Sequence, residues 1–257
     1  MHNLFLAFRQ VKYENKSFWR NPAAAFFTFV LPLTFLVIFN LLLGDNDFQV
    51  SGGVTRTSYF YIPGIITLSV VSACYTNISI GICISRDRGL LKRIKGTPLP
   101  SWVFLFGRIV NAIFITLLLV ILVVLIGAIF FDVGLPRSTL PAMLVTLMLG
   151  AITFCSLGVA VTTLVPNGDA APAAINASVL PLLFVSDVFI PITDGPGWLG
   201  IITHIFPIKP FSTALQTVFN PFESGMGFEF ADLGIMLLWA VFGVAIAIRY
   251  FSWESRG

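Results

Sequence analysis

The sequence predicts an all-α integral membrane protein with six transmembrane helices, and three observations lead to this fold class. Only 11% of the 257 residues are charged, whereas 57% are hydrophobic; an ordinary soluble domain carries about 25% charged residues. The mean hydropathy is +0.93. Six apolar stretches are candidates for helices that cross the hydrocarbon core, which takes about 20 residues. A soluble chain of this length could not bury so much apolar surface, and a net charge of +3 gives no indication of nucleic-acid binding.

We expect residues 1–22 to form an amphipathic helix that lies in the membrane interface. Apolar and basic side chains separate onto two faces when this segment is drawn as a helix. The apolar face has Leu4, Phe8, Val11 and Phe18, and the basic face has Arg9, Lys12 and Lys16. A loose basic tail is the alternative.

The six predicted spans follow, and all belong to a single domain, residues 1–257. They are residues 23–43, 59–83, 103–131, 140–165, 171–185 and 231–251. The third is long enough to tilt or to begin in the interface. The fifth is short and begins beside Pro172, so its ends are the least well defined.

Lysine and arginine placement predicts the orientation, because cytoplasmic loops carry an excess of both residues. Twelve of the fifteen lie in the N-terminal segment, between residues 86 and 108, or after residue 248. The other three, Arg56, Arg137 and Lys209, would lie on the opposite side. This distribution predicts a multi-pass protein of the cell (plasma) membrane, with both termini and the loop after the second span in the cytoplasm.

Residues 190–220 do not have the pattern of a span, because prolines and glycines interrupt them. Two pieces, Gly200–Phe206 and Phe211–Phe219, are nevertheless apolar. Short apolar segments of this kind are typical of re-entrant or interfacial helices. We therefore expect extracellular re-entrant helices before the last span.

The sequence contains no recognisable catalytic or cofactor-binding motif. A phosphate-binding loop of the form Gly-x-x-x-x-Gly-Lys-[Ser/Thr] is absent, so the chain is not expected to hold ATP in that way. Its cysteines, Cys74, Cys83 and Cys155, lie in apolar runs without metal-ligand spacing. We therefore expect no catalytic residue, no metal site and no cofactor on this chain.

No Asp, Glu, Lys or Arg lies at the centre of a predicted span. Ion-coupled carriers usually place ionisable residues inside the membrane, so the sequence argues against secondary transport and indicates that energy enters from outside the bilayer. Asn77, Thr116 and Asn176 are the more polar side chains near mid-span. They are candidates for a substrate path or for hydrogen bonds between helices.

The loop after the second span carries the most informative pattern. Its residues are Arg86, Asp87, Arg88, Gly89, Leu90, Leu91, Lys92, Arg93 and Ile94, followed by a Gly-Thr-Pro-Leu-Pro stop. Leu90, Leu91 and Ile94 can line one face of a short helix, which Gly96 and Pro98 would end. A basic loop alone would mark topology or contact lipid headgroups. The apolar face and the stop favour a helix, residues 86–97, that docks on a partner.

This segment resembles the second intracellular segment of the ABC-2-type transporter permeases, which often reads Arg-Glu-Arg-Gly-Thr-Leu-Lys-Arg-Leu, a small residue and Thr-Pro-Leu. A second similarity is Val188-Phe189-Ile190-Pro191, followed by Gly197-Trp198-Leu199 and Phe206-Pro207. The family likewise has a Phe-x-Pro element, a Pro-x-Trp-Leu element and a Pro-rich stretch before its last span. The resemblance covers essentially the whole chain, and the drug- and antibiotic-resistance exporters of the daunorubicin type are the most similar subgroup. Leu90 departs from the pattern, which more often has threonine there.

The resemblance implies the membrane subunit of an ATP-binding-cassette exporter for a hydrophobic or amphipathic substrate, such as a drug, a lipid or a lipid-linked glycan. Its partners would be two copies of a cytosolic ATPase subunit, which hold ATP and Mg, a second permease copy or homologous permease, and membrane lipid. Residues 86–97 would be the coupling helix. The re-entrant segment, residues 190–220, would close the outer side. Its gate residues would be Phe189, Pro191, Trp198, Phe206 and Pro207.

Three further function classes remain open at this point. A membrane-embedded transferase would need a convergent set of polar residues at one interface, and the sequence offers none. A scaffold without transport and an ion-coupled carrier are the second and third classes. Small residues such as Gly243 and Ala247 could pack against a second permease or within one subunit.

Overall fold

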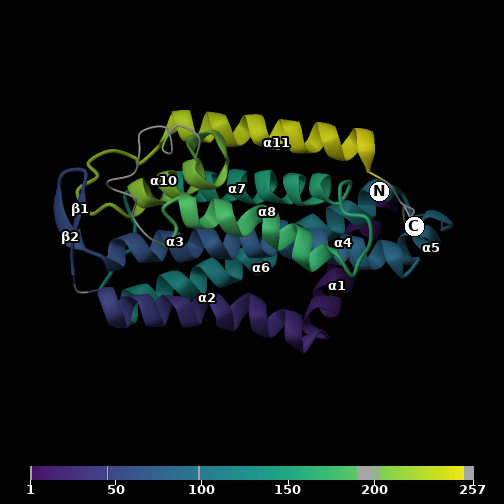
Figure 1. Ribbon diagram of the computed structural model, residues 1–257, viewed down its shortest axis with the longest axis horizontal. Helices are drawn as coiled ribbons and strands as arrows, with labels where there is room; N and C mark the ends of the chain where they lie inside the picture. Colours follow the sequence, from purple (N-terminus) through teal and green to yellow (C-terminus); the bar gives the residue numbers. More distant parts are fainter. Residues whose placement is uncertain (1, 45, 98, 190–199, 201–202, 252–257) are drawn as a thin grey trace.

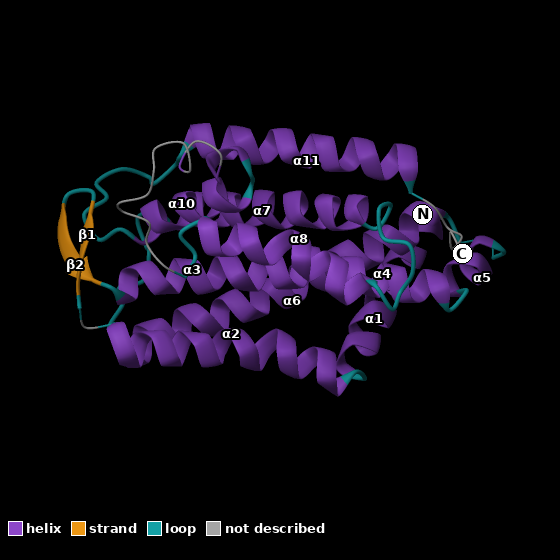
Figure 2. Cartoon of the chain, in the orientation of Figure 1, coloured by secondary structure: helices purple, strands orange, loops and turns teal. Residues whose placement is uncertain are grey.

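Long helices that lie side by side make up most of the chain (Figure 1, Figure 2). The structure, a computed structural model, describes residues 2–44, 46–97, 99–189, 200 and 203–251. The helices are α1 (His2–Trp19), α2 (Pro22–Leu43), α3 (Ser58–Val71), the π-helical turn η1 (Ser72–Thr76), α4 (Asn77–Asp87), α5 (Leu90–Lys95), α6 (Ser101–Phe130), α7 (Leu140–Val161), α8 (Ala171–Val185), α10 (Ile208–Phe219) and α11 (Phe230–Tyr250). Two short strands, β1 (Asp47–Val50) and β2 (Gly53–Arg56), complete the described elements. The predicted all-α class is confirmed.

Five helical stretches among the described residues are long and apolar enough to cross a membrane. They are Pro22–Leu43, Ser58–Asp87, Trp102–Phe130, Leu140–Val161 and Phe230–Tyr250. The predicted fifth span is present as helix α8, whose bounds agree with the prediction. Its 15 residues extend only about 22 Å, short of a hydrocarbon core about 30 Å thick. The chain is therefore a multi-pass membrane protein, with five long apolar helices and one short one among its described residues.

The second span is longer than predicted, because α3, η1 and α4 form one continuous helix from Ser58 to Asp87. We expected it to end at Cys83 and a separate helix to begin at Arg86. Both Arg86 and Asp87 instead belong to the last turn of α4. The π-helical turn inserts an extra residue into the helix, a feature that is frequent at functional sites.

Helix α1 lies along the first half of α6. Asn15 Nδ2 donates a hydrogen bond of 3.1 Å to Asn111 Oδ1, and a Cβ added at Gly107 would come within 3.0 Å of Gln10 Cβ. The absence of a side chain at Gly107 is therefore what lets the two helices approach. These contacts identify residues 2–19 as a packed helix and set aside the loose-tail alternative.

The core lies between α3, α7, α10 and α11. Every residue of α3 from Phe60 to Val71 is buried, and Phe154 of α7 packs edge-on against Phe211 of α10, with ring centroids 5.5 Å apart. A Cβ at Gly243 of α11 would come within 2.6 Å of Ser156 Oγ. Gly243 therefore serves packing within this chain.

The outer helices α2, α6 and α11 present large apolar side chains to the surroundings. Leu41, Leu42, Phe130, Leu238 and Ile248 are each more than two thirds exposed. A monomeric soluble protein rarely exposes apolar surface on this scale, whereas lipid tails accept it. Hydroxyl groups inside the spans can bond to the carbonyl four residues earlier, as Thr28 of α2 and Thr153 of α7 do at 2.7 and 2.8 Å, so their polar atoms are satisfied without water.

The two ends of the bundle differ (Figure 1). The antiparallel β1–β2 hairpin, which no sequence pattern indicated, lies at one end and turns at Gly52, whose φ of 102° suits glycine. Helix α10 belongs to this half, since Asn220 at its end donates a hydrogen bond of 2.9 Å to the Ser51 carbonyl. Helix α5 lies at the opposite end. Of the predicted re-entrant segment, residues 190–199, 201 and 202 lie outside the described residues.

Candidate functional site

The predicted coupling segment is bent at Gly89. Helix α4 ends at Asp87, and Gly89 turns the chain into α5 with a φ of 67°. This left-handed conformation carries little steric penalty for glycine and a larger one for other residues. After α5, Thr97 Oγ1 donates a hydrogen bond of 2.7 Å to the Ile94 carbonyl and closes the last turn. The segment 86–97 is therefore the end of one helix and a second, short helix at an end of the bundle.

Helix α5 does not present its three apolar side chains on one outer face. Leu91 is fully buried in the main core and Ile94 packs against that core, whereas Leu90 is 45% exposed. The prediction of a shared docking face is wrong, because consecutive helical residues point about 100° apart and the preceding turn directs Leu91 inward. The outer face of α5 consists of Leu90 with the exposed side chains of Lys92 and Arg93.

Arg86 and Asp87 fasten the end of α4 to the connection between α7 and α8. Arg86 is 3% exposed, and its Nη1 and Nη2 atoms donate hydrogen bonds to the carbonyls of Thr162 at 3.0 Å and Val165 at 2.6 Å. The Asp87 carboxylate accepts a hydrogen bond from the Gly168 backbone N–H. The last carbonyls of a helix lack partners within it and carry partial negative charge, which a cation stabilises.

This set of contacts, which we call the Arg86–Asp87 clasp, corrects one prediction. We expected Arg86 to belong to the helix that docks on a partner, but its guanidinium is buried within the chain. Arg88, Lys92 and Arg93 remain exposed. Within the segment 86–97, these three residues therefore offer positive charge at the surface, whereas the buried Arg86 and the exposed Asp87 bond to the connection between α7 and α8.

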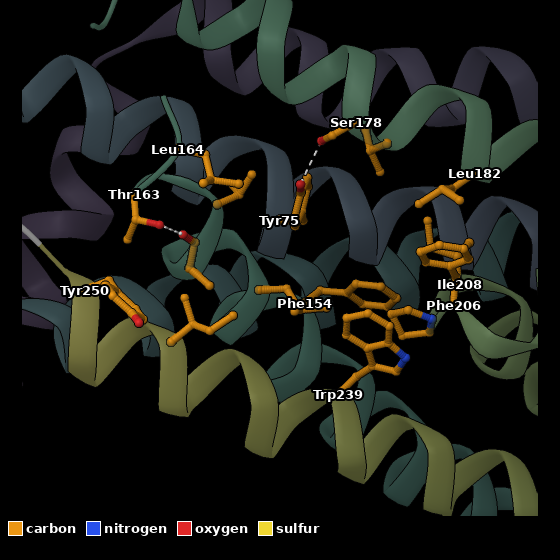
Figure 3. A pocket seen from close by; sticks show the side chains of 16 residues that line it. Tyr75, Phe154, Thr163, Leu164, Ser178, Leu182, Phe206, Ile208, Trp239 and Tyr250 are labelled. Carbon is orange, nitrogen blue, oxygen red and sulfur yellow. Dashed lines mark hydrogen bonds between the residues drawn. The ribbon is translucent and has the colours of Figure 1, made fainter. Parts of the chain in front are cut away.

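A cavity of about 510 Å³ lies between α7, α8 and α11 (Figure 3). Its wall is mainly apolar, with Phe154, Leu157, Val179, Leu182, Ile208 and Trp239 among the lining side chains. Pockets that hold small molecules are typically about 300–1,000 Å³ and lined mostly by hydrophobic and aromatic side chains. The cavity has the size and lining of a site for a hydrophobic molecule.

A tyrosine–serine pair lies in this mainly apolar wall. Tyr75, which the π-helical turn η1 directs into the cavity, has its hydroxyl 2.7 Å from Ser178 Oγ on α8 (Figure 3). Ser178 is exposed, and so are Leu164 and Tyr250 at the rim. An amphipathic molecule could place its polar part near the tyrosine–serine pair and its apolar part among the side chains of α7 and α11.

The structure divides the predicted gate residues between two places. Phe206 and Pro207 line the cavity, and Phe206 stacks on Trp239 with ring centroids 6.0 Å apart. Phe189 is 8% exposed and packs instead against Phe184 and Phe35. The other two predicted gate residues, Pro191 and Trp198, lie outside the described residues.

The three predicted substrate-path residues do not come together around one described cavity. Asn77 Nδ2 donates a hydrogen bond of 3.0 Å to Thr28 Oγ1 and lines a smaller, polar cavity next to α1. Thr116 is buried, with its hydroxyl 3.3 Å from Cys74 Sγ. Asn176 lies on α8 and is half-buried. Their role in a substrate path stays a prediction, and the first two also serve as hydrogen-bond partners between helices.

Four ion pairs among the described residues were missed by reasoning from the sequence. They are Arg56 with Asp132 at 3.9 Å, Glu14 with Arg108 at 3.6 Å, His204 with Asp232 at 3.0 Å, and Lys209 with Asp187. The signal is weak, because the charge pattern marks Arg108 only as a cytoplasmic residue, and Asp232 lies in the first turn of its helix, away from the span centre. Within the described ranges, no group of three or more His, Cys, Asp or Glu side chains could hold a metal ion.

Known proteins similar to this chain are membrane permeases. A family model described as ABC-2 type transporter matches residues 8–220. The putative transport permease ycf38 of Cyanophora paradoxa is 29% identical over 196 residues, which are 74% of this chain and 65% of that protein. The probable multidrug ABC transporter permease YbhS of Escherichia coli (strain K12) is 26% identical over 167 residues, which are 63% of this chain and 43% of that protein.

The inner membrane transport permease YadH of Escherichia coli (strain K12) is 24% identical over 201 residues, which are 75% of this chain and 77% of that protein. The chain spans just under two thirds of the ycf38 protein and less than half of YbhS. The residues matched by the family model extend from α1 to the end of α10, and so include the predicted coupling segment and the clasp.

Proposed function

Because this chain belongs to the ABC-2 type transporter family, we propose that it is the membrane-spanning subunit of an ATP-driven exporter for hydrophobic or amphipathic molecules. The family resemblance predicted from the sequence is confirmed by the match over residues 8–220. The observation that carries the proposed function is the Arg86–Asp87 clasp. It joins the end of α4, which leads into α5, to the connection between α7 and α8, two helices that wall an apolar cavity.

Energy would enter at α5 from a separate cytosolic ATPase that holds ATP and Mg. Leu90 offers the apolar contact, with Lys92 and Arg93 beside it. Burying one leucine side chain is worth roughly 1.5–3 kcal/mol, whereas an exposed ion pair is worth about 0–1 kcal/mol. Leu90 would therefore supply most of the docking strength at this face, and the cations would set orientation.

Movement of α5 would reach the cavity by a short route. The clasp ties the end of α4 to Val165 and Gly168, which lie just before α8, and α8 contributes Ser178, Val179 and Leu182 to the cavity wall. A second route leads through the short connection after α5 into α6. Docking of ATPase subunits at α5 would in this way change the spacing of α8 from α7 and α11.

The cavity supports a cargo with a large apolar part and a small polar one. Its wall combines aromatic and aliphatic side chains with one hydroxyl pair, Tyr75 and Ser178. A drug, a lipid or a lipid-linked glycan would satisfy this description. Export of an antibiotic would give resistance to it.

For the orientation of the chain in the membrane and its assembly with other subunits, the proposal keeps the predictions made from the sequence. The basic residues of α1 and of the loop around α5 favour a cytoplasmic location for that end, with both termini inside the cell. Two permeases, either identical or homologous, would pair with two ATPase subunits in the plasma membrane. The exposed apolar faces of α2, α8 and α11 provide surface for a second permease or for lipid.

An ion-coupled carrier is the second candidate, and one observation favours it. Asp232 is 4% exposed and lies 3.0 Å from His204 Nε2. Ionisable pairs within membrane proteins often mark ion or proton paths. Against this role, Asp232 lies in the first turn of α11, close to the membrane surface rather than at the depth where a carrier would bind its ion.

Reconstitution tests the two functions against each other. The full-length chain and its ATPase partner would be placed in vesicles, and accumulation of a fluorescent hydrophobic dye would be measured. We expect transport to require ATP and Mg and to persist when a protonophore collapses the pH gradient. Transport by the chain without the ATPase, driven by an imposed proton or sodium gradient, would overturn the exporter in favour of a carrier.

A further inference from the structure

A second cavity, of about 260 Å³, lies between α1, α2, α6 and the η1–α4 part of the second span. It differs from the larger cavity in being polar. Its polar lining side chains are Glu14, Ser17, Asn21, Asn77, Arg108 and Asn111. The remaining lining residues are apolar, and four of the six polar side chains belong to α1 and α6.

Arg108 lies in this wall, and one of its three side-chain nitrogens has no hydrogen-bond partner. Its Nε lies 3.6 Å from Glu14 Oε2, its Nη2 lies 3.4 Å from Ser85 Oγ, and the guanidinium lies over the Phe104 ring at 5.4 Å. The Nη1 atom is buried and has no hydrogen-bond partner. A buried donor without an acceptor is costly, so an oxygen acceptor brought next to Nη1 would be stabilised.

Glu14 restricts what that acceptor can belong to. Its carboxylate accepts a hydrogen bond of 2.9 Å from Gln10 Nε2 and lies beside Arg108. Each side chain of the pair is less than one fifth exposed. A purely anionic ligand would be attracted by the Arg108 guanidinium but repelled by the neighbouring Glu14 carboxylate. A group that carries both an anionic oxygen and a cationic N–H donor matches both side chains.

The depth of the cavity suits a lipid headgroup. Arg108 lies seven residues after the start of α6, and Asn77 ten residues before the end of α4, which corresponds to about 10 and 15 Å along the helices. With these helix ends at the membrane surface, the cavity would lie just below the headgroup layer of the leaflet next to α1 and α5, within reach of a headgroup. Phe26, Phe27 and Phe114 on α2 and α6 are each more than half exposed and offer apolar surface for acyl chains.

We infer that this cavity binds the zwitterionic headgroup of a phospholipid that carries a primary ammonium, with phosphate oxygen accepting from Arg108 Nη1 and the ammonium donating to Glu14. A phosphocholine headgroup has no N–H to donate, and a phosphoglycerol headgroup has no cation. The site is therefore selective for the ethanolamine type. The lipid site does not depend on what the transporter carries. An experiment can therefore refute the site without refuting the proposed function, and the reverse.

Native mass spectrometry of the delipidated full-length chain would test this site. Phosphatidylethanolamine, phosphatidylcholine and phosphatidylglycerol with identical acyl chains would be offered in equal amounts. We expect phosphatidylethanolamine to be retained about fivefold more than either competitor, which is about what one hydrogen bond contributes. Glu14→Gln should abolish the preference over phosphatidylcholine and raise retention of phosphatidylglycerol. Lys12→Gln, on the exposed face of the same helix, should leave the preference unchanged.

Arg108→Lys provides a second variant that keeps the charge. It should weaken retention of all three lipids and preserve their order. Equal retention of the three lipids by the unaltered chain, or the same lipid preference in Glu14→Gln as in the unaltered chain, would overturn the site. Displacement of the lipid by millimolar free phosphoethanolamine would assign the cavity to a soluble ligand and overturn the lipid assignment.

Discussion

The Nη2 atom of Arg86 lies 2.6 Å from the carbonyl oxygen of Val165, although 79 positions separate the two residues in the chain. The guanidinium donates hydrogen bonds to backbone carbonyls beyond the end of α7, which have no partners within that helix. With the neighbouring bond to Thr162 and the Asp87–Gly168 contact, it makes the end of α4 and the beginning of α8 parts of one unit. A displacement of α5 that moves the end of α4 must carry the beginning of α8 with it or break these bonds.

Replacement of this arginine tests whether the clasp transmits movement. Arg86→Gln should lower the free energy of unfolding by about 2–3 kcal/mol, because buried carbonyls lose charged donors. It should also lower dye-stimulated ATPase activity of the complex, because α8 is released from α4. Apparent melting temperature in detergent and ATPase activity in matched vesicles measure the two effects.

Arg88→Gln is the matched control, because Arg88 is exposed two residues away and surface substitutions usually change stability by less than about 0.5 kcal/mol. Its melting temperature should stay within error of the unaltered chain. An Arg86→Gln variant with unchanged stability and unchanged stimulation would remove the clasp from the mechanism.

The two adjacent leucines of α5 should respond differently to the same change. Leu91→Asp places a charge in the core, where burial of a leucine contributes about 1.5–3 kcal/mol, and should reduce the amount of folded protein in the membrane. Leu90→Asp should leave folding intact and weaken binding of the ATPase. Fluorescence size-exclusion profiles report folding, and co-purification of the ATPase reports docking.

The contrast between these leucines also separates a surface role from a packing role. If Leu90→Asp retained the ATPase while Lys92→Ala lost it, charge rather than apolar contact would dominate the docking face. If both leucine variants folded normally, Leu91 would not have the buried position described above.

The spans could be predicted from the sequence within a few residues, because each must place about 20 apolar side chains in lipid and that requirement is local. The direction of α5 could not be predicted, because the left-handed Gly89 sets how the helix leaves α4. The burial of Leu91 depends on where the rest of the bundle lies. No local pattern in residues 86–97 distinguishes Leu90 from Leu91.

Long-range partners account for most of the remaining differences. In the sequence, Arg86 and Arg108 both count as cytoplasmic charges, and charges of this kind do predict an orientation. Each also pairs with a segment far away in the sequence: Arg86 donates to a carbonyl at the end of α7, and Arg108 forms an ion pair with Glu14 of α1. Such pairings depend on tertiary arrangement, which one sequence without its fold does not specify.

The Lys209–Asp187 pair should contribute measurably to stability at the hairpin end. Both side chains are less than one fifth exposed, and Asp187 has a left-handed φ of 53° that asparagine also tolerates. Asp187→Asn therefore removes the charge without adding backbone strain. In a double-mutant cycle with Lys209→Met, we expect a coupling energy of about 1 kcal/mol from denaturant unfolding in detergent.

The Arg56–Asp132 pair is a suitable comparison for that cycle. Its atoms are 3.9 Å apart, and the side chains are 54% and 86% exposed. Exposed pairs contribute about 0–1 kcal/mol. A double-mutant cycle on Arg56 and Asp132 should therefore give a coupling energy close to zero. Equal coupling energies for the two pairs would contradict the distinction made from burial.

Filling the larger cavity should discriminate between cargoes by size. Leu182 on α8 points into the cavity beside Ile208 (Figure 3), and Leu182→Trp would occupy space that a bulky molecule needs. Overpacking costs about 1–3 kcal/mol, so the apparent affinity for a large dye should fall about tenfold. A small dye should be transported almost normally, and basal ATPase activity should be kept because the clasp and α5 are untouched.

Leu180→Trp is the control for this variant, because Leu180 lies on the same helix, is 45% exposed and does not line the cavity. It should leave the affinity for both dyes unchanged. Concentration-dependent uptake into vesicles, measured for the two dyes with each variant, gives the four affinities to compare. If Leu182→Trp lowered uptake of both dyes equally, the tryptophan would be acting on helix movement rather than on cargo. If neither variant changed the affinity for the large dye, the cavity would not be on the path that cargo takes.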